Sequence, residues 1–308
     1  VIISSSGLTN SAAKNAKLEA AGAGAIVLKS LFEEQIMMEA DRLRNPSYYP
    51  EGSDYLAEYI RNHKLAEYLE LIKESKKVCT IPVIASINCY TDAEWVDFAK
   101  QIEEAGADAL EINILALQSD IQYKYGSFEQ RHIDILSHIK KTIRIPVIMK
   151  LGSNFTNPVA LIDQLYANGA AAVVLFNRFY QPDIDVEKME HTSGDVFSNA
   201  SDLSTTLRWI GISSSLVSKI DYAASGGIHK PDGIVKAILA GASAIEICSA
   251  IYQNTNLFVG EMNRFLSAWM ERKGFKHISQ FKGKLNAKDV EGINMFERTQ
   301  FLKYFSEK

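Results

Sequence analysis

The sequence predicts a single domain over residues 1–308, folded as a (β/α)8 barrel. Apolar strands alternate with amphipathic helices, one helix-glycine-strand unit recurs, and 308 residues suffice for one large α/β barrel. Alternating strands and helices imply a parallel sheet, and eight of each imply closure into a barrel. An open doubly wound sheet is the alternative, but the G-x-G-x-x-G turn typical after its first strand is absent.

Four segments join the end of a helix to a buried strand through a glycine next to alanines. They are EAAGAGAIVLK (19–29), EEAGADALEIN (103–113), YANGAAAVVLFN (166–177) and ILAGASAIEIC (238–248). The apolar runs fit strands that are covered on both faces. The glycines fit the left-handed position just after a helix, and they are Gly22, Gly106, Gly169 and Gly241.

The remaining strands and the helices complete the alternation. Further strands are predicted at 1–6, 81–88, 145–151 and 220–225, two of them entered through Ile-Pro, where proline removes no needed ladder hydrogen bond. Apolar residues at three-to-four spacing predict helices at 11–21, 56–76, 92–105, 128–142, 157–168, 203–217, 231–240 and 256–273. Asn10, Thr91 and Asn157 are predicted N-caps.

Composition predicts a cytoplasmic protein that binds neither nucleic acid nor membranes. The net charge of −4 and the pI near 5.9 leave no excess of basic side chains for polyanions. No apolar run approaches the roughly 18–20 residues that cross a bilayer, and no signal segment is seen. Cys79, Cys89 and Cys248 lack metal-type spacing and fit a reducing compartment. The scattered histidines predict no metal site, and the G-x-S-x-G motif of serine hydrolases is absent.

Residues 220–250 hold the clearest candidate binding site. Gly226 and Gly227 follow an apolar strand, so a ligand can approach their backbone N–H groups closely. Cys248 and Ser249 end the next strand and open a helix whose first N–H groups have no internal partners. Two such turns side by side predict a phosphate site, and a tight turn without a ligand is the alternative for either alone.

Polar residues close the other strands, where a barrel places its active site. Lys150 ends the otherwise apolar strand IPVIMK, which is costly unless the lysine meets an anion or an electron-rich ring. A lysine that reaches solvent at the rim is the alternative. Asn113 and Asn177 suit the edge of a flat heterocycle, or they cap loops. The first two strands end in Ser5, Gly7 and Lys29.

Two long connections, 32–55 and 178–202, follow strand ends and are predicted to cover the site. Their aromatic residues favour ordered covers over disordered excursions: Tyr48, Tyr49, Tyr55, Phe179 and Tyr180.

Eight segments occur in order and at barrel spacing: SSSGLT, AIVLKS, ADALEIN, IPVIMKL, VVLFN, ASGGI, AGASAIEICSA and HISQFKGKL. This ordered set covers essentially the whole chain and resembles the dihydroorotate dehydrogenase family, the FMN-containing (β/α)8 barrels of pyrimidine synthesis. The resemblance implies oxidation of dihydroorotate to orotate. It also implies an FMN phosphate on Gly226, Gly227, Cys248 and Ser249, and a flavin ring near Ser5, Gly7, Lys29, Asn113 and Lys150.

The resemblance further implies the catalytic set Lys150, Asn113, Asn177 and Lys29. In it Lys150 stabilises the reduced ring, and the two asparagines hold an orotate-like substrate. The resemblance suggests a homodimer, to which Phe179 and Tyr180 could contribute. Fumarate, NAD through a partner subunit, or another soluble acceptor would take the electrons.

Two positions depart from the family pattern. The family continues the strand of Asn113 with N-L-S-C-P-N, or with serine for cysteine, where that residue removes a proton from the substrate. This chain has N-I-L-A-L-Q, so Ala116 supplies no proton acceptor. The segment NPSYYPEG (45–52) replaces an asparagine-rich run, N-S-x-G-x-x-N. Cys89 is nearest in type to the missing base, but a small buried residue is the favoured interpretation.

Other groups and other functions remain as hypotheses. The candidates for a substitute base lie in the same loop and are Ser119, Asp120, Tyr123 and Tyr125. One alternative function is a phosphosugar aldolase or isomerase in which Lys150 or Lys29 forms a Schiff base. Another is a flavin-binding protein that has lost its catalytic activity, which Ala116 would explain.

Overall fold

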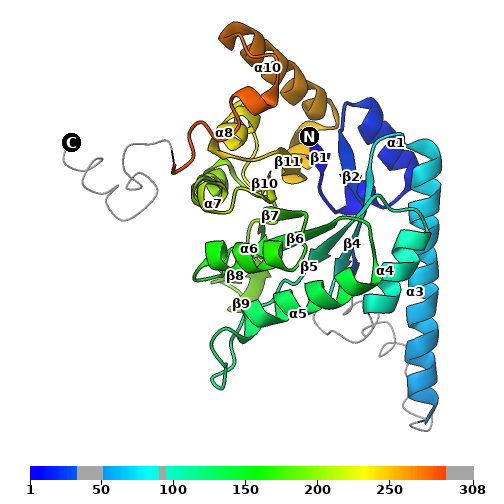
Figure 1. Ribbon diagram of the computed structural model, residues 1–308. Helices are drawn as coiled ribbons and strands as arrows, with labels where there is room; N and C mark the ends of the chain where they lie inside the picture. The colour runs from blue at the N-terminus through cyan, green and yellow to red at the C-terminus, as the bar shows by residue number, and fades with distance from the viewer. Residues whose placement is uncertain (33–50, 90–94, 289–308) are drawn as a thin grey trace. The chain divides into compact units, whose positions relative to one another are not determined.

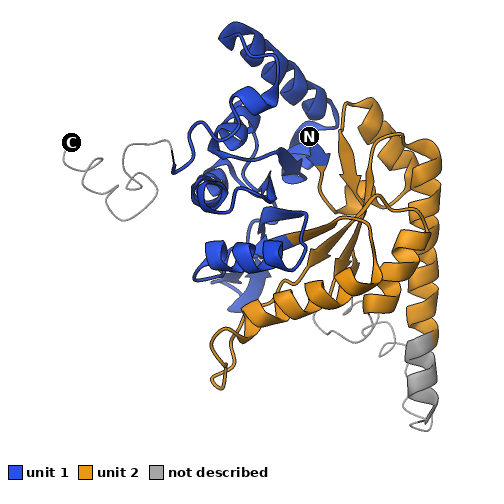
Figure 2. Cartoon of the chain, in the orientation of Figure 1, with its two compact units in different colours: residues 1–2, 150–308 blue, residues 3–149 orange. Residues whose placement is uncertain are grey.

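The computed structural model describes residues 1–32, 51–89 and 95–288, and its strand order is that of the predicted (β/α)8 barrel (Figure 1). The chain divides into two compact units (Figure 2). Unit 1 comprises residues 1–2 and 150–308, and unit 2 comprises residues 3–149. The chain passes from unit 2 into unit 1 inside strand β6 (Val147–Gly152). The single domain over residues 1–308 stays a prediction.

Unit 2 contains the first part of the alternation. After β1 (Ile2–Ile3), its strands are β2 (Ala25–Val27), β3 (Leu31–Phe32), β4 (Val83–Asn88) and β5 (Ala109–Asn113). Its helices are α1 (Ala12–Ala20), α3 (Glu51–Val78), α4 (Trp95–Glu104) and α5 (Ser127–Thr142). Strand β4 pairs in parallel with β2, β3 and β5. Every residue of β4 and β5 is buried, as expected for strands covered on both faces.

The helices of unit 2 bury one face, as their spacing predicts. In α4 the buried residues are Trp95, Phe98, Ala99 and Ile102, which recur at three- and four-residue intervals. Strand β1 is shorter than the predicted strand 1–6 because Ser6 caps a 3-10 turn at Gly7–Thr9 and its hydroxyl accepts a hydrogen bond from Leu8 N at 3.2 Å. The N-cap of α1 is Ser11, so the prediction of Asn10 is wrong by one residue.

Unit 1 contains the rest of the alternation. Its strands after β6 are β7 (Ala172–Asn177), β8 (Pro182–Asp185), β9 (Glu190–Ser193), β10 (Asp221–Ser225) and β11 (Ala244–Ile247). Its helices are α6 (Pro158–Ala167), α7 (Leu203–Leu216), α8 (Asp232–Ala240), α9 (Ser249–Asn254) and α10 (Leu257–Lys273). Strand β10 pairs in parallel with β7 and β11. Asn157 caps α6 as predicted, and its side chain accepts a hydrogen bond from Ala160 N at 3.1 Å.

The four recurring glycines have the predicted conformation. Their φ angles are 104° at Gly22, 97° at Gly106, 93° at Gly169 and 124° at Gly241. L-residues rarely adopt these angles, so the glycines allow each helix to stop and the chain to enter the next strand at once.

The connection 178–202 is not an unstructured loop. It contains the antiparallel hairpin β8–β9, in which Ile184 pairs with His191, and the 3-10 turn Ala200–Asp202. Residues 33–50 of the other predicted loop and the predicted N-cap Thr91 lie outside the described residues. None of the helices in the described residues is both long and apolar enough to cross a membrane.

Candidate functional site

The predicted phosphate site lies in unit 1 at the carboxyl ends of β10 and β11. Ser225 ends β10 and is followed by Gly226 and Gly227, with φ angles of 94° and 74°. Cys248 follows β11, and Ser249 opens α9, which is only six residues long. Ser225 and Glu246 are register partners, so the two turns leave neighbouring strands at the same edge. The structure thus brings the four predicted phosphate ligands together.

The two glycines serve different purposes. A Cβ on Gly227 would lie 2.1 Å from the backbone nitrogen of Leu203, so the start of α7 packs directly on this residue. A Cβ on Gly226 would meet only Thr206 Oγ1, at 3.9 Å. Gly227 is therefore needed for packing, whereas the backbone at Gly226 has space beside it for a ligand.

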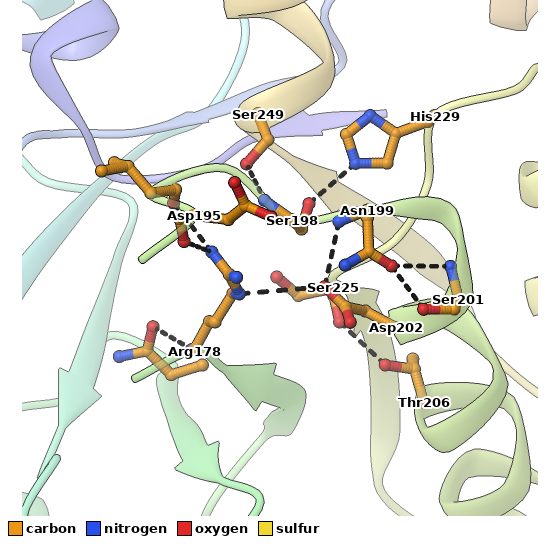
Figure 3. A network of polar contacts seen from close by, with 12 residues as sticks. Arg178, Asp195, Ser198, Asn199, Ser201, Asp202, Thr206, Ser225, His229 and Ser249 are labelled. Carbon is orange, nitrogen blue, oxygen red and sulfur yellow. Dashed lines mark hydrogen bonds and ion pairs between the residues drawn. The ribbon is translucent and has the colours of Figure 1, made fainter. Parts of the chain in front are cut away.

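Residues 195–202 fold back onto the phosphate site (Figure 3). Ser198 N donates to Ser249 Oγ at 3.1 Å, and Ser198 Oγ lies 2.9 Å from His229 Nε2. His229 Nδ1 is buried and has no hydrogen-bond partner among the described residues. One ring nitrogen of a histidine beside the phosphate site is thus available to a ligand.

Arg178 holds this returning segment (Figure 3). Its Nη1 donates to the carbonyl oxygens of Asp195 and Val196, both at 2.8 Å, and its Nε lies 3.8 Å from Asp202 Oδ2. Asn177, which ends β7, accepts a hydrogen bond from Arg178 N on its Oδ1 at 2.8 Å. Since its Oδ1 is engaged locally, Asn177 would meet a substrate through its amide NH₂ group.

Lys150 is buried in β6 and does not reach solvent. It is 5% exposed, and its ammonium contacts Oε1 of Glu246, which is 2% exposed, on β11. The anion that the sequence requires beside this lysine is therefore a carboxylate of the protein itself. Such a pair is stable in a buried setting only when both partners stay in contact.

In unit 2, three hydroxyls form a chain: Ser5 follows β1, Ser30 lies between β2 and β3, and Ser86 lies within β4. Ser5 Oγ lies 2.9 Å from Ser30 Oγ, which lies 2.7 Å from Ser86 Oγ. Ser30 N donates to Ser5 Oγ at 2.8 Å. Ser86 N donates to the phenol oxygen of Tyr68 at 2.6 Å, and burial raises the pKa of that phenol. These contacts hold the Ser5 hydroxyl in place at the strand end.

The other predicted residues of unit 2 differ in exposure. Asn113 ends β5 and is 7% exposed, and its Oδ1 has no hydrogen-bond partner among the described residues. A buried acceptor of this kind costs free energy unless a ligand or water donates to it. Lys29 and Gly7 are exposed. Exposure leaves the Lys29 side chain in solvent in this structure.

The loop that carries Ala116 offers no buried proton acceptor. Ser119, Asp120 and Tyr125 are exposed, Tyr125 to 94%. Asp120 Oδ1 accepts a hydrogen bond from Gln122 N at 2.8 Å. Tyr123 is only partly exposed, and its hydroxyl lies 3.4 Å from Glu129. None of the four candidates for a substitute base is buried.

Several side chains of the site went unnoticed in the sequence. A glutamate interrupts both apolar strands ALEIN and AIEIC, and both glutamates, Glu111 and Glu246, are buried. That interruption was a visible signal, since a buried charge needs a partner. Arg178, Ser198 and His229 carried no such signal, because their contacts depend on how residues 178–202 fold back.

Comparison with known proteins adds independent information. A family model described as "Dihydroorotate dehydrogenase" matches residues 1–270. The "Dihydroorotate dehydrogenase B (NAD(+)), catalytic subunit" of Thermoplasma volcanium is 26% identical over 271 residues, covering 85% of this chain and 86% of the relative. The protein of the same description from Methanosarcina acetivorans is 26% identical over 268 residues, with 85% and 84% covered. "Dihydroorotate dehydrogenase A (fumarate)" of Lactobacillus delbrueckii subsp. bulgaricus is 24% identical over 220 residues, with 70% and 71% covered.

Proposed function

Because the chain belongs to the dihydroorotate dehydrogenase family and is therefore an oxidoreductase of that type, we propose that it binds FMN and passes hydride between a dihydropyrimidine-like substrate and the flavin. The observation that carries this proposal is that unit 1 contains both a buried lysine and a phosphate-type site. Lys150 lies within β6, Gly226 and Gly227 follow β10, and Cys248 and Ser249 follow β11. A flavin phosphate needs the N–H groups, and its ring needs the cation.

The residues present fit the group. Gly226 leaves space beside its backbone, as a phosphate approaching the N–H groups requires. Asn113 Oδ1 and His229 Nδ1 are among the buried polar atoms that have no hydrogen-bond partner in the described residues. Asn113 Oδ1 accepts hydrogen bonds, and a flavin or a pyrimidine ring carries N–H donors at its edge. Asn113 Oδ1 therefore matches a donor group of the proposed ligands.

FMN, when bound, supplies the hydride-accepting position at N5. The backbone N–H groups of Gly226 and Gly227, together with Cys248 and the Ser249 hydroxyl, would hold the phosphate. Lys150 would supply a positive charge to the ring. Ser5, Gly7 and Lys29 are proposed as ring contacts on the family resemblance alone. Asn113 and Asn177 are proposed as substrate contacts on the family resemblance, and each side-chain amide offers both donors and an acceptor.

The proton acceptor is the part of the site that is missing. Ala116 has no group that can take the C5 proton of dihydroorotate, and the candidates Ser119, Asp120 and Tyr125 are exposed. General-base assistance typically contributes on the order of 10²–10⁴-fold to such a step. We therefore propose that the protein turns over dihydroorotate weakly or not at all. We further propose that its substrate is a related compound whose oxidation does not depend on this base.

One observation counts against the aldolase alternative. A Schiff-base lysine attacks through a free lone pair on its nitrogen, whereas the Lys150 nitrogen is engaged in an ion pair with Glu246. The other alternative is a protein that binds FMN in the same way but does not oxidise a substrate.

Flavin loading tests the proposed function. Purified protein, incubated with FMN and freed of excess by gel filtration, should retain the visible absorption of an oxidised flavin. Protein that stays colourless would refute the proposal, and borohydride trapping of a phosphosugar on Lys150 would favour the aldolase. Anaerobic bleaching of the bound flavin by a dihydropyrimidine would distinguish an enzyme from a binding protein.

We further propose that the protein is a homodimer, as the family resemblance suggests. Phe179 and Tyr180 are the aromatic residues proposed to contribute, and Tyr180 is 71% exposed. Sedimentation of the wild type and of Tyr180→Ser would test this, and a monomeric wild type would refute it.

A further inference from the structure

We propose that Glu246 lowers the reduction potential of the flavin by opposing the positive charge of Lys150. The inference rests on the proposed function, since it requires FMN beside Lys150. It concerns a residue of this chain that the cofactor assignment leaves without a role.

The two residues form an ion pair inside unit 1. The ammonium of Lys150 contacts Glu246 Oε1, and the two side chains are 6% and 1% exposed. Strands β6 and β11 are separated by β7 and β10 in the sheet order, so the side chains reach each other across two intervening strands. Removing two charges from water is costly, and apolar residues of the same volume would often be more stable. A role beyond stability would account for keeping the pair.

Glu246 lies on the strand that leads into the phosphate site. Its register partner Ser225 directly precedes Gly226 and Gly227. Two residues after it comes Cys248, the N-cap residue of α9. A flavin held by this site and by Lys150 is therefore subject to the charge of Glu246 as well.

The ring gains negative charge when it is reduced. Hydride transfer to N5 adds two electrons and one proton and leaves one negative charge near N1 and O2. The oxidised substrate is the other product. Lys150 stabilises the new charge, and the carboxylate of Glu246 opposes it. Because both groups are buried, solvent and salt screen this effect far less than on the surface. The flavin is consequently harder to reduce than it would be beside Lys150 alone.

The two-electron reduction potential of the FMN-loaded protein tests this inference. Glu246→Gln removes the charge and keeps a side chain of similar size and hydrogen-bonding capacity. We expect anaerobic titration with dithionite against a reference dye to show a shift of at least tenfold toward reduced flavin, which is about 30 mV for two electrons. Asp232→Asn is the control, since it removes one negative charge from an exposed pair with Lys236 in the same unit, and it should cause no shift.

Each outcome bears on one of the two proposals. A potential that is unchanged or lower in Glu246→Gln, with FMN bound, overturns the inference and leaves the proposed function intact. Wild-type protein that takes up no FMN overturns both. If Glu246→Gln does not fold, Glu246→Asp provides the measurement, because it keeps the charge but withdraws it from Lys150 by one methylene. It should then change the potential measurably, and an unchanged potential in that variant equally overturns the inference.

Discussion

Single residues decide the backbone conformation at the proposed phosphate site. Gly226 and Gly227 are adjacent in sequence and share a positive φ, yet only Gly227 packs against backbone atoms of α7. An L-residue in the left-handed region costs about 1–2 kcal/mol. Forcing a methyl group into a filled space typically costs about 1–3 kcal/mol more. An added methyl group at Gly227 would therefore have to displace backbone atoms, whereas one at Gly226 would not.

Replacing each glycine by alanine measures that difference. We expect Gly226→Ala to lower the free energy of unfolding by about 1–2 kcal/mol. Gly227→Ala should lower it by about 3 kcal/mol or more, because its Cβ would lie 2.1 Å from Leu203 N. Urea unfolding monitored by fluorescence gives both values. Equal losses at the two positions would contradict the packing described for Gly227.

Ala116 is the second residue with a sharp expectation. In Ala116→Cys a thiol stands where the family has its proton acceptor, and we expect dihydroorotate to reduce the bound flavin about 10²–10⁴-fold faster. Anaerobic stopped-flow absorbance measures this rate. Ala116→Val changes the volume without adding an acceptor and is the control. No gain in Ala116→Cys, together with no binding of orotate, would mean that the pocket suits a different substrate.

At the scale of elements, helix α5 packs a histidine into the core of unit 2. His132 is fully buried, and its Nδ1 lies 2.8 Å from the carbonyl oxygen of Phe128. Burial lowers the pKa of His132 to about 4 from the usual 6.5, although contacts with the backbone of Phe128 and Ile114 act in the opposite direction. The side chain that α5 buries here is therefore a neutral imidazole at neutral pH.

This pKa makes the stability of unit 2 depend on pH. Above about pH 6.5 neither the folded nor the unfolded chain protonates His132. Between about pH 6.5 and pH 4 only the unfolded chain takes up the proton. The free energy of unfolding therefore decreases as the pH is lowered, by up to about 1.4 kcal/mol per pH unit. Urea unfolding at several pH values in this range gives the free energy of unfolding as a function of pH. This dependence should be flatter in His132→Asn than in the wild type. The exposed His138 provides the control variant His138→Asn, and an unchanged slope in His132→Asn would refute the assignment.

The segment 195–202 depends on Arg178. A guanidinium can donate to two carbonyl oxygens at once, as Arg178 does to Asp195 and Val196, whereas an ammonium lacks this planar geometry. We expect Arg178→Lys to be cleaved by chymotrypsin after Phe197 several-fold faster than the wild type. Mass spectrometry of a limited digest identifies the cut. Arg208→Lys, on α7 of the same unit, is the control, and equal cleavage in all three proteins would count against the role of Arg178.

At the scale of the whole molecule, the division into two units bears on cooperativity. Strand β6 is shared, because unit 2 ends at Met149 and unit 1 resumes at Lys150. Unit 1 also includes residues 1–2, from the opposite end of the sequence. The division therefore cuts through both β1 and β6, and we expect the predicted single domain over residues 1–308 to unfold in one transition.

Tryptophan fluorescence can follow each unit separately. Trp95 lies in unit 2, and Trp209 and Trp269 lie in unit 1. We expect Trp95→Phe and the double variant Trp209→Phe/Trp269→Phe to report coincident urea transitions after correction for any change in stability. Two separate transitions would show that the units are independent domains.

The sequence by itself determined the (β/α)8 fold and the ends of most elements. These features are local: the spacing of apolar residues distinguishes a helix from a strand, and Gly22, Gly106, Gly169 and Gly241 mark where helices stop. The predicted helix 128–142 and the observed α5 differ by one residue at the start. The same locality explains why Gly226, Gly227, Cys248 and Ser249 could be named together, since each pair follows a strand directly.

Only the tertiary structure decided which side chains meet. The partner of Lys150 is 96 residues away in the sequence, and Ser198 is 51 residues from Ser249. Such contacts depend on strand register and on how residues 178–202 fold back, and no local pattern encodes either. The loop after Asn113 shows the same limit, because the sequence supplied candidate bases there while their exposure followed from packing alone. Local propensity specifies elements, whereas the identity of a buried ion's partner is a property of the assembled core.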